Sequence, residues 1–434
     1  MQELKVSVFT PTHKTEYLLE AYYSIKDQPY DQWVIYPNGG LTELDIPDEI
    51  KSDSRTKLVG LDGCFQPILA SDGLANIGSL KKFICSQCDG TVIVELDHDD
   101  MLISPGIERI REVFRDPEVV FAYSNTAEFN QSDKSPRFFG NANAQNNYDS
   151  HNGWRYRDFY YDNVLYKEAL SPSPNPYNVS IILFAPNHLR SFRKSTYDEI
   201  GGHNENMHIC DDQDLMCRMY LKGKFYWIDE CCYLYRVTGQ NSWLQRNSDI
   251  QNTMVDVQKQ YIQPMVEIWA KRNNFDMIDL GGRFGCPSGY KSVDLKDADI
   301  ICDLNEKWPF DDSSIGVIRA YDVIEHLNDM IHVMSEMYRV LRPGGFAFLM
   351  IPSTDGRGAW QDPTHKLFIN QNSFFYYTRQ IQAKYIDNTT IRFRAVTLET
   401  YFPSDWERNN NIPYVRADLI VLKGDYPLMG HNDI

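Results

Sequence analysis

The stretch Thr91-Val92-Ile93-Val94-Glu95-Leu96-Asp97-His98-Asp99-Asp100 decides how the first half of this 434-residue chain is expected to fold. Its apolar run predicts a buried strand, and the strand ends in a cluster of carboxylates. Mg²⁺ and Mn²⁺ prefer oxygen ligands and keep positions open for phosphates, so such a cluster suits a divalent cation that carries a diphosphate. The alternative is a solvated acidic turn before a helix at Pro105-Gly106, because strand-to-helix loops favour Asp.

Length and composition set the class of protein. A chain of 434 residues exceeds the size at which one core keeps growing, so we expect two domains. The formal net charge of -17 disfavours a broad surface for nucleic acid or anionic membrane, although a local basic groove stays open. No apolar run approaches the ~20 residues of a membrane span, so we expect a cytoplasmic protein without an integral membrane segment. The nine cysteines are scattered, which predicts reduced core thiols.

Short apolar runs alternate with helical stretches from Val6 to about Asn125. This rhythm predicts a doubly wound α/β sheet. Ligands of such sheets bind beyond the carboxyl ends of the strands, which is where Thr10-Pro11-Thr12, Asn38-Gly39 and the run from Asp97 to Asp100 fall. We therefore expect these residues to converge.

The pattern changes twice further along the chain. From Asp133 to Asn178 it breaks into Asn, Tyr, Ser and Pro, which predicts a long functional loop. A second α/β rhythm starts at Met277, after a helical connector over residues 250–273. We place the domain boundary within residues 262–274, with one domain over residues 1–262 and the other over residues 275–434.

The first domain resembles the GT-A glycosyltransferases of the large inverting family two. The resemblance lies in six motifs that occur in the family's order: Val6-Ser7-Val8-Phe9-Thr10-Pro11-Thr12-His13, Leu74-Ala75-Asn76-Ile77-Gly78, Val94-Glu95-Leu96-Asp97-His98-Asp99-Asp100, Gly201-Gly202-His203-Asn204-Glu205, Asp211-Asp212-Gln213-Asp214-Leu215 and Tyr235-Arg236-Val237. It implies a nucleotide-diphosphate sugar donor (UDP-, GDP- or dTDP-linked) and Mn²⁺ or Mg²⁺.

The resemblance also implies roles for single residues. Asp97 contacts the ribose or the metal, Asp99 binds the metal, and Asp212 is the catalytic base that takes the proton of the acceptor hydroxyl. The donor pocket is expected from Thr10, Pro11, Thr12, Asn38, Asn76, Asp97 and Arg236. The alternatives are a strand-ending turn at Pro11 and capping of a helix by Asp211 and Asp212.

Two positions depart from the family pattern. Asn38 stands where an acidic residue usually follows the second strand, and it can hydrogen-bond only without charge. Thr238 stands where a metal-binding His often follows the Tyr-Arg motif, which moves the expected diphosphate contact to Arg236, Gln240, Trp243 or a His elsewhere such as His188. The aromatic-rich segment from Asn141 to Tyr166 is expected to form the acceptor wall or to cover the sheet.

The second domain resembles the class I methyltransferases that use S-adenosylmethionine. The matching motifs include Ile278-Asp279-Leu280-Gly281-Gly282, Ser292-Val293-Asp294, Ile301-Cys302-Asp303-Leu304, Asp322-Val323-Ile324-Glu325-His326-Leu327 and Arg342-Pro343-Gly344-Gly345. The resemblance implies a Rossmann-like fold with cofactor contacts from Asp279, Gly281, Gly282, Asp294, Asp303 and Asp322. Arg283 replaces the second glycine of the family's Gly-x-Gly, so a degenerate binding module is the alternative.

Two further segments of this domain contain chemically active side chains. Glu325-His326 can hold a substrate, and Asp362-Pro363-Thr364-His365 can supply a second carboxylate and imidazole near the cofactor pocket. A His in either place is also a common structural hydrogen-bonding residue.

Three functions follow as hypotheses. The first is a metal-dependent inverting glycosyltransferase that acts on a surface polysaccharide or similar glycan, with a second domain that methylates the product. The second is transfer to hydroxymethylated bases of viral DNA, through a groove with Arg155, Arg157, Arg190, Arg193 and Lys194. The third makes the C-terminal half a non-catalytic binding module.

Overall fold

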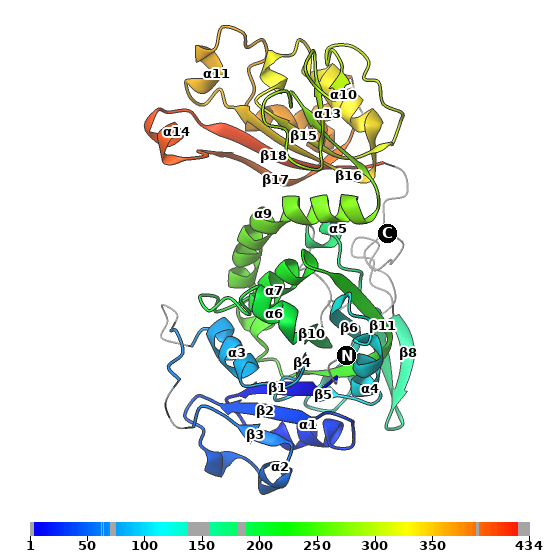
Figure 1. Cartoon of the computed structure of the whole chain (residues 1–434), viewed down its shortest axis with the longest axis vertical. Helices are drawn as coiled ribbons and strands as arrows, with labels where there is room; N and C mark the ends of the chain where they lie inside the picture. The colour runs from blue at the N-terminus through cyan, green and yellow to red at the C-terminus, as the bar shows by residue number, and fades with distance from the viewer. Residues whose placement is uncertain are drawn as a thin grey trace. The chain divides into compact units, whose positions relative to one another are not determined.

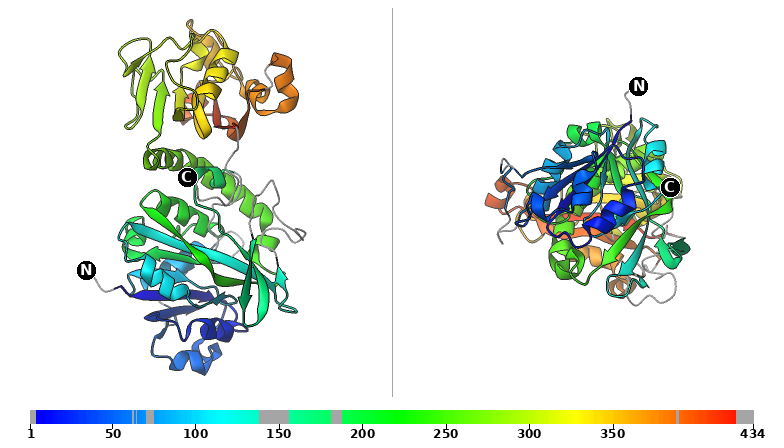
Figure 2. Two further views of the ribbon diagram at one scale, coloured as in Figure 1. Left: turned by 90° about the vertical axis from the view of Figure 1, so that its right-hand side faces the viewer. Right: turned by 90° about the horizontal axis from the view of Figure 1, so that it is seen from below.

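The computed structural model describes residues 4–61, 63, 65–69, 75–137, 156–180, 188–387 and 390–423. The chain divides into two compact units, one up to Tyr261 and the other from Ile262 onward, and the division falls inside the long helix α9 (Asn247–Arg272). Figure 1 and Figure 2 show a sheet with helices in each unit. Among the described helices, none is both long enough and apolar enough to cross a membrane.

The N-terminal domain is built on one mixed sheet. Its strands are β1 (Val6–Thr12), β2 (Gln32–Pro37), β3 (Thr56–Leu58), β4 (Val92–Glu95), β5 (Met101–Leu102), β6 (Val119–Asn130), β7 (Pro136–Arg137), β8 (Tyr156–Tyr161), β9 (Val164–Ala169), β10 (Arg190–Arg193) and β11 (Lys224–Val237). The main path runs β3-β2-β1-β4-β10-β6-β11-β5. Strands β1, β2, β3 and β4 are parallel, whereas β10 is antiparallel to β4 and β6.

Helices cover both faces of this sheet. Successive side chains of each strand point to opposite faces, so apolar strand residues pack against helices on both sides. Val6 and Val8 of β1 pack with Leu18, Ala21 and Ile25 on the apolar face of α1. Phe9, the residue after Val8, lies edge-on to Phe192 on the other face. The helices of this domain are α1 (Leu18–Ile25), η1 (Glu43–Asp45), α2 (Asp48–Ser52), α3 (Ile77–Ser86), α4 (Gly106–Val113), α5 (Pro176–Val179), α6 (Lys194–Glu199), α7 (Asp211–Tyr220), α8 (Ser242–Gln245) and the first part of α9.

The region expected to be one long loop, Asp133 to Asn178, is more ordered in its described part. Strands β8 and β9 form a hairpin that pairs Tyr161 with Val164. The two residues between them, Asp162 and Asn163, have φ values of 49° and 62°, as a type I′ turn requires. The expectation of a loop was therefore wrong here, and the Asp-Asn pair between aromatic runs was the overlooked hairpin signal. Residues 141–155 of the expected acceptor wall lie outside the described residues.

The C-terminal domain contains a second sheet, of seven strands within the described residues. Its strands are β12 (Asp276–Leu280), β13 (Lys291–Asp294), β14 (Ile300–Ile301), β15 (Ile315–Tyr321), β16 (Leu341–Pro352), β17 (Phe393–Tyr401) and β18 (Tyr414–Val421). They run in the order β14-β13-β12-β15-β16-β18-β17, with β18 antiparallel to its neighbours. The first five follow the 3-2-1-4-5 order of a doubly wound sheet.

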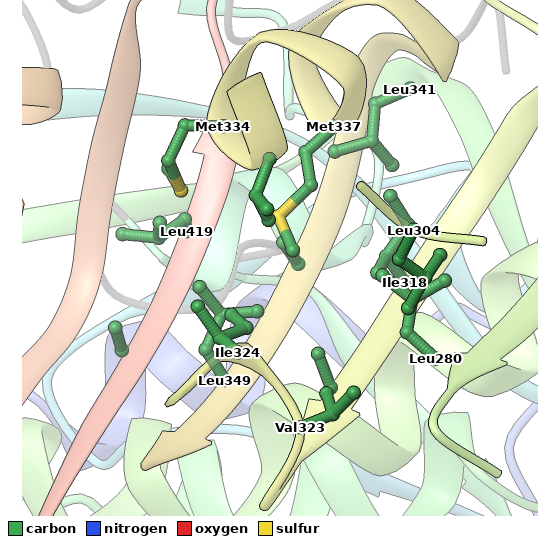
Figure 3. Close-up of a cluster of buried hydrophobic side chains, with 14 of the residues drawn as sticks. Leu280, Leu304, Ile318, Val323, Ile324, Met334, Met337, Leu341, Leu349 and Leu419 are labelled. Atoms are coloured by element: carbon green, nitrogen blue, oxygen red, sulfur yellow. The ribbon is translucent and has the colours of Figure 1, made fainter. Parts of the chain in front are cut away.

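The core of this domain lies where helix α10 (Met330–Val340) packs on the sheet. Figure 3 shows Met334 and Met337 of α10 against Ile318, Leu349 and neighbouring strand residues. The remaining short helices are η2 (Ile324–His326), α11 (Gly358–Gln361), η3 (Gln371–Phe374), α12 (Phe375–Thr378), α13 (Gln380–Ala383), η4 (Lys384–Ile386) and α14 (Asp405–Asn409). The predicted fold class, two doubly wound α/β domains, is confirmed.

One buried side chain ties three elements of the N-terminal sheet together. The indole Nε1 of Trp33 in β2 donates to the Thr10 hydroxyl in β1 (2.9 Å), and that hydroxyl donates to the Leu96 carbonyl after β4 (2.7 Å). The variant Trp33→Phe loses the donor and some packing, so we expect its free energy of unfolding to fall by about 2 kcal/mol. Chemical denaturation measures this, with Trp406→Phe, whose side chain is exposed, as the control. Equal stability of the two variants would contradict the structural role of Trp33.

Candidate functional site

A chain of buried ion pairs lies at the carboxyl ends of β1 and β4. At its centre, Oε1 of Glu95 in β4 forms an ion pair with Lys81 Nζ of α3 (2.6 Å), and Oε2 accepts from Arg190 Nη1 of β10 (3.4 Å). Lys81 Nζ also lies 3.2 Å from Asp211 Oδ2, and Arg190 Nη2 lies 2.6 Å from Asp212 Oδ2. These five residues, which we name the Glu95 network, join four separate segments of the domain, α3, β4, β10 and α7.

Burial and charge set the protonation states in the Glu95 network. Burial by itself raises the pKa of the Glu95 carboxyl, but Lys81 and Arg190 outweigh it, and the pKa lies well below its usual range. Burial raises the pKa of Asp211 to about 6, although Lys81 opposes the shift. The two acids on α7 also differ in access, because the Asp212 side chain is 19% exposed and that of Asp211 only 6%. Asp212 is therefore the carboxylate of this pair that a substrate can reach.

The backbone accounts for this placement of Asp211 and Asp212. Helix α7 begins at Asp211, and the residue before it, Cys210, has a left-handed conformation with φ of 58°. The N-cap residue is Cys210, but Oδ1 of Asp212 accepts from the Gln213 amide (2.8 Å), so Asp212 also satisfies a backbone amide in the first turn of the helix. Both aspartates lie in the first turn, where the positive end of the helix dipole stabilises a carboxylate.

A second group of side chains, Asp97, Asp100 and His188, lies beside the network. One potential ligand atom from each lies within 4.8 Å of the other two. Asp100 is fully buried and its Oδ2 has no hydrogen-bond partner among the described residues, and the same holds for Nδ1 of His188. Burial, to which the charges of Glu95 and Asp99 add, raises the pKa of Asp97 to about 7. We name these three residues the Asp97 group.

The Asp97 group fits a divalent cation. Two carboxylates and a neutral imidazole form a ligand set that Mn²⁺ accepts. A bound ion would also compensate the free-energy cost of the two buried atoms that have no hydrogen-bond partner among the described residues. His188 is neutral, because burial and the charge of Arg190 hold its pKa well below the usual range. The ring of His188 stacks on that of Tyr233 at 4.6 Å, and the Tyr233 hydroxyl accepts from the Asp97 amide, so both side chains are held in place. Asp99, the predicted second metal ligand, is not in this group, and its role stays a prediction.

The expected donor-pocket residues occupy different kinds of position. Thr10, Pro11 and Thr12 are buried at the end of β1, and the hydroxyls of both threonines bond to backbone carbonyls. Asn38 is half-buried, and its backbone N–H donates to the Thr12 carbonyl. Asn76 is buried, with Nδ2 donating to the Glu205 carbonyl and Oδ1 unpartnered among the described residues.

Arg236 lies inside the domain rather than at an open surface. Its side chain is 1% exposed, its Nε donates to the Asp99 carbonyl (2.7 Å), and its amide donates to Asp100 (2.7 Å). Its Nη2 donates to Glu20, and the guanidinium stacks over Tyr17. Arg236 thus holds the loop that carries the acidic cluster.

The C-terminal domain brings its predicted cofactor residues to one edge. Gly281 follows β12 with φ of 72°, and a Cβ on it would meet Val323 at 2.8 Å. Asp279 is fully buried, accepts from Arg319 (2.7 Å), and leaves Oδ2 without a hydrogen-bond partner among the described residues. A Cβ on Gly282 would meet that oxygen at 2.7 Å, so the glycines keep the turn open.

The other predicted cofactor residues follow later strands of the same sheet. Asp294 ends β13 and is half-buried, whereas Asp303 and Asp322 are exposed. Arg283, which stands where the family has a glycine, forms an ion pair through Nη2 with Asp297 (2.6 Å), three residues after Asp294. The bulky cation is thus engaged with the loop after β13.

Known proteins resemble parts of this chain. Residues 284–349 match the methyltransferase domain family. A stretch of 85 residues, 19% of the chain, is 33% identical to a probable S-adenosylmethionine-dependent methyltransferase of Mycolicibacterium smegmatis (strain ATCC 700084 / mc(2)155). It spans 31% of that relative's length. The predicted resemblance of the C-terminal domain to methyltransferases is confirmed.

Two solved structures with bound sugar nucleotides are similar to parts of this chain. S. aureus TarS 1-349 in complex with UDP-GlcNAc has a TM-score of 0.40 and 11% identity, and covers 63% of this chain and 73% of its own. The mannosyltransferase PcManGT from Pyrobaculum calidifontis, in complex with GDP-Man and Mn2+, has a TM-score of 0.36 and 12% identity, over 58% of this chain and 63% of its own. Scores at this level carry no weight for activity.

Sequence reasoning overlooked the Glu95 network. Lys81 lies on the same helix face as Leu80 and Ile84, and Glu95 interrupts an apolar strand, so both were charges at positions where burial was expected. A buried charge needs a partner of opposite sign. That signal was present in the sequence, but the identity of the partners was not.

Removal of Lys81 tests the network. In Lys81→Met the carboxylates of Glu95 and Asp211 lose their shared cation, and we expect the free energy of unfolding at pH 8 to fall by about 3–5 kcal/mol. Both carboxyls would then have pKa values above those of the unfolded chain, so the variant regains stability relative to wild type as the pH falls toward 5. Denaturant unfolding at several pH values measures the difference.

The neighbouring Lys82 provides the matched control, because it pairs with Glu205 at the surface and its side chain is 39% exposed. Lys82→Met should change stability by less than about 1 kcal/mol at every pH. A loss in Lys81→Met that is independent of pH would contradict the assigned charges.

Proposed function

We propose that the N-terminal domain is a metal-dependent inverting glycosyltransferase that moves a sugar from a nucleotide-diphosphate donor to a hydroxyl acceptor. The observation that carries the proposal is the placement of a reachable carboxylate, Asp212, and a candidate metal group around the same cations. Arg190 pairs with Asp212, and the charges of Arg190 and Lys81 act on Asp97. Acid–base chemistry and diphosphate binding thus share one electrostatic site.

In this proposal Asp212 is the general base. An inverting transfer needs a carboxylate that takes the proton of the acceptor hydroxyl while the oxygen attacks the anomeric carbon. Arg190 holds the Asp212 carboxylate in one orientation through a 2.6 Å ion pair, and Glu95 holds Arg190 in turn. Oδ1 of Asp212 accepts from the Gln213 amide (2.8 Å), so both oxygens of Asp212 are oriented before the acceptor binds.

The Asp97 group would hold the cation, with Asp97 and Asp100 as oxygen ligands and His188 as the nitrogen ligand. A bound Mn²⁺ or Mg²⁺ would supply positive charge to the departing diphosphate. His188 takes the place for which the motif pattern predicted an imidazole near Thr238. We assign Arg236 to positioning of the Asp99-Asp100 loop, and Asn38 with the backbone after β1 to the nucleotide.

The acceptor is proposed to be a glycan. The alternative acceptor, DNA, needs free cations along a groove. Arg157 instead pairs with Glu168 and Asp229, and Lys194 pairs with Asp198. Arg193 donates to backbone carbonyls, and Arg190 belongs to the Glu95 network. These bonds engage the four groove cations that lie among the described residues, whereas Arg155 lies outside them. The engagement of these four cations favours the glycan over DNA.

For the C-terminal domain we propose S-adenosylmethionine binding and methylation of the transferred sugar. The residues fit this cofactor, since Asp279 offers a buried oxygen without a partner to an ammonium group and Asp294 offers a carboxylate to ribose hydroxyls. Bound S-adenosylmethionine would supply the methyl group. The glycine turn at Gly281 lets the backbone approach it.

The base assignment is tested by Asp212→Asn. The amide cannot take a proton, so we expect turnover to fall by roughly 10²–10⁴-fold while donor binding is retained. The measurement is sugar transfer and donor hydrolysis with UDP-, GDP- and dTDP-linked sugars, with Mn²⁺ and with a chelator. Asp198→Asn, at an exposed ion pair on α6, is the matched control. Unchanged turnover in Asp212→Asn, or full activity in chelator, would contradict the proposal.

Calorimetry tests the second domain. We expect S-adenosylmethionine to bind the full chain with micromolar affinity, and Asp294→Ala to weaken it by roughly tenfold or more, the value of a lost charge-assisted hydrogen bond. Asp311→Ala, at an exposed loop position, should bind as wild type does. No binding by a folded chain would instead favour the non-catalytic module.

A further inference from the structure

Two imidazoles and a carboxylate meet beside the carboxyl end of β15, outside the predicted cofactor contacts. One potential ligand atom each of Glu325, His326 and His365 lies within 4.8 Å of the other two. The backbone creates this meeting, because the Glu325 carbonyl accepts from the amides of Lys366 (2.7 Å) and Leu367 (2.9 Å). The loop with His365 is thereby fixed against η2. We name these three residues the Glu325 group.

Hydrogen bonds hold both imidazoles with the same nitrogen free. Nδ1 of His365 lies 2.9 Å from the Ala359 carbonyl, which only accepts, so this nitrogen carries the proton. Nδ1 of His326 lies 3.0 Å from the Thr364 hydroxyl, and that hydroxyl donates its own proton to Asp362 (2.7 Å). The Thr364 oxygen therefore accepts from His326. In both rings Nε2 is left with the lone pair that binds a metal.

The carboxylate of the group is short of partners. Glu325 is 2% exposed, and its Oε2 has no hydrogen-bond partner among the described residues. Its Oε1 lies 4.0 Å from Nε2 of His365, and Oδ2 of Asp362 lies equally far from that nitrogen. A buried carboxylate oxygen without a donor is costly unless a cation compensates it.

We propose that Glu325, His326 and His365 bind a divalent transition metal ion of the zinc type. Two imidazole nitrogens and one carboxylate are a ligand set used by Zn²⁺ sites with an open coordination position. Metal–ligand bonds of about 2.0–2.2 Å place neighbouring ligand atoms roughly 3.3 Å apart in a tetrahedral site. Nε2 of His365 and Oε1 of Glu325 are 4.0 Å apart, and no two ligand atoms of the group are more than 4.8 Å apart. Side-chain rotations close these gaps, and the fourth coordination position stays open.

The open position would take an oxygen of the substrate. This part of the inference rests on the proposed methyl transfer. The metal would bind the acceptor hydroxyl and make its proton easier to release to water, while the O–CH3 bond would form as the S–CH3 bond of S-adenosylmethionine breaks and the thioether leaves. Metal binding itself depends only on the Glu325 group. The two statements can therefore fail separately.

The experiment is a Co²⁺ titration of the full chain after chelator treatment, followed by Zn²⁺ competition. Co²⁺ reports its ligands through visible absorption bands. Because the Asp97 group also contains an imidazole, the titration is run in wild type and in an Asp97→Asn, His188→Ala background. We expect one Co²⁺ to bind in that background with bands of a four- or five-coordinate site, and Zn²⁺ to displace it.

Variants assign the bands to residues. In the same background, His326→Ala and Glu325→Gln should each weaken Zn²⁺ binding roughly 100-fold or more, and Thr364→Val, which removes only the orienting hydroxyl, about 10- to 100-fold. His332→Ala on α10 is the matched control, since this half-buried imidazole lies 3.0 Å from the Glu306 carbonyl and is not part of the Glu325 group. Near-ultraviolet circular dichroism of each metal-free variant shows whether the fold is retained.

Three results would overturn the inference: no Co²⁺ bands in the folded background protein, bands that persist in His326→Ala, or equal loss of binding in His332→Ala. Loss of the bands with S-adenosylmethionine binding retained supports a separate metal site. A bound metal without any methyl transfer would leave the site standing and overturn only its role toward the acceptor.

Discussion

In both domains the first strand pairs in parallel with the strand on either side, β1 with β2 and β4, and β12 with β13 and β15. Parallel pairing sends the carboxyl ends of these strands to one edge of the sheet, and the crevice at which the strand order reverses lies between the two neighbours. The backbone N–H and C=O groups of the loops that follow are not paired by the sheet, so polar side chains are common there. Residues as far apart as Phe9 and Glu95 are neighbours in the sheet because of this constraint.

Burial of charge organises the N-terminal site. Glu95 has almost no access to water, and its ionised form survives because Lys81 and Arg190 approach from α3 and β10. Those same cations then reach Asp211 and Asp212 at the start of α7. The cation that compensates the buried carboxylate of Glu95 is therefore the one that orients Asp212, which we propose as the catalytic base. The same ion pairs thus stabilise the fold and position the proposed site.

The structure redistributes several roles among the residues that the motifs marked. Thr10 was expected to face the nucleotide, yet its hydroxyl joins β1 to Trp33 and Leu96. Arg236 was expected at the diphosphate, yet it is buried under the acidic loop. Motif matching reports that a residue type is needed at a position, whereas only packing shows whether its polar atoms point to a ligand or to the protein itself.

The amino-acid sequence by itself determined the two α/β domains, the carboxyl-edge loops and the methyltransferase resemblance of the second half, and it marked Asp97 and Asp212 as candidates. These depend on local periodicity and on contiguous motifs, which the order of residues records directly. Only the tertiary structure decided that Asp100 and His188 join Asp97, that Arg190 orients Asp212, and that His365 meets Glu325. Asp97 and His188 are 91 residues apart in the sequence, Glu325 and His365 are 40 apart, and Arg190 and Asp212 are 22 apart. Contacts over such separations are set by how the sheets pair and the loops fold back, which no local pattern encodes.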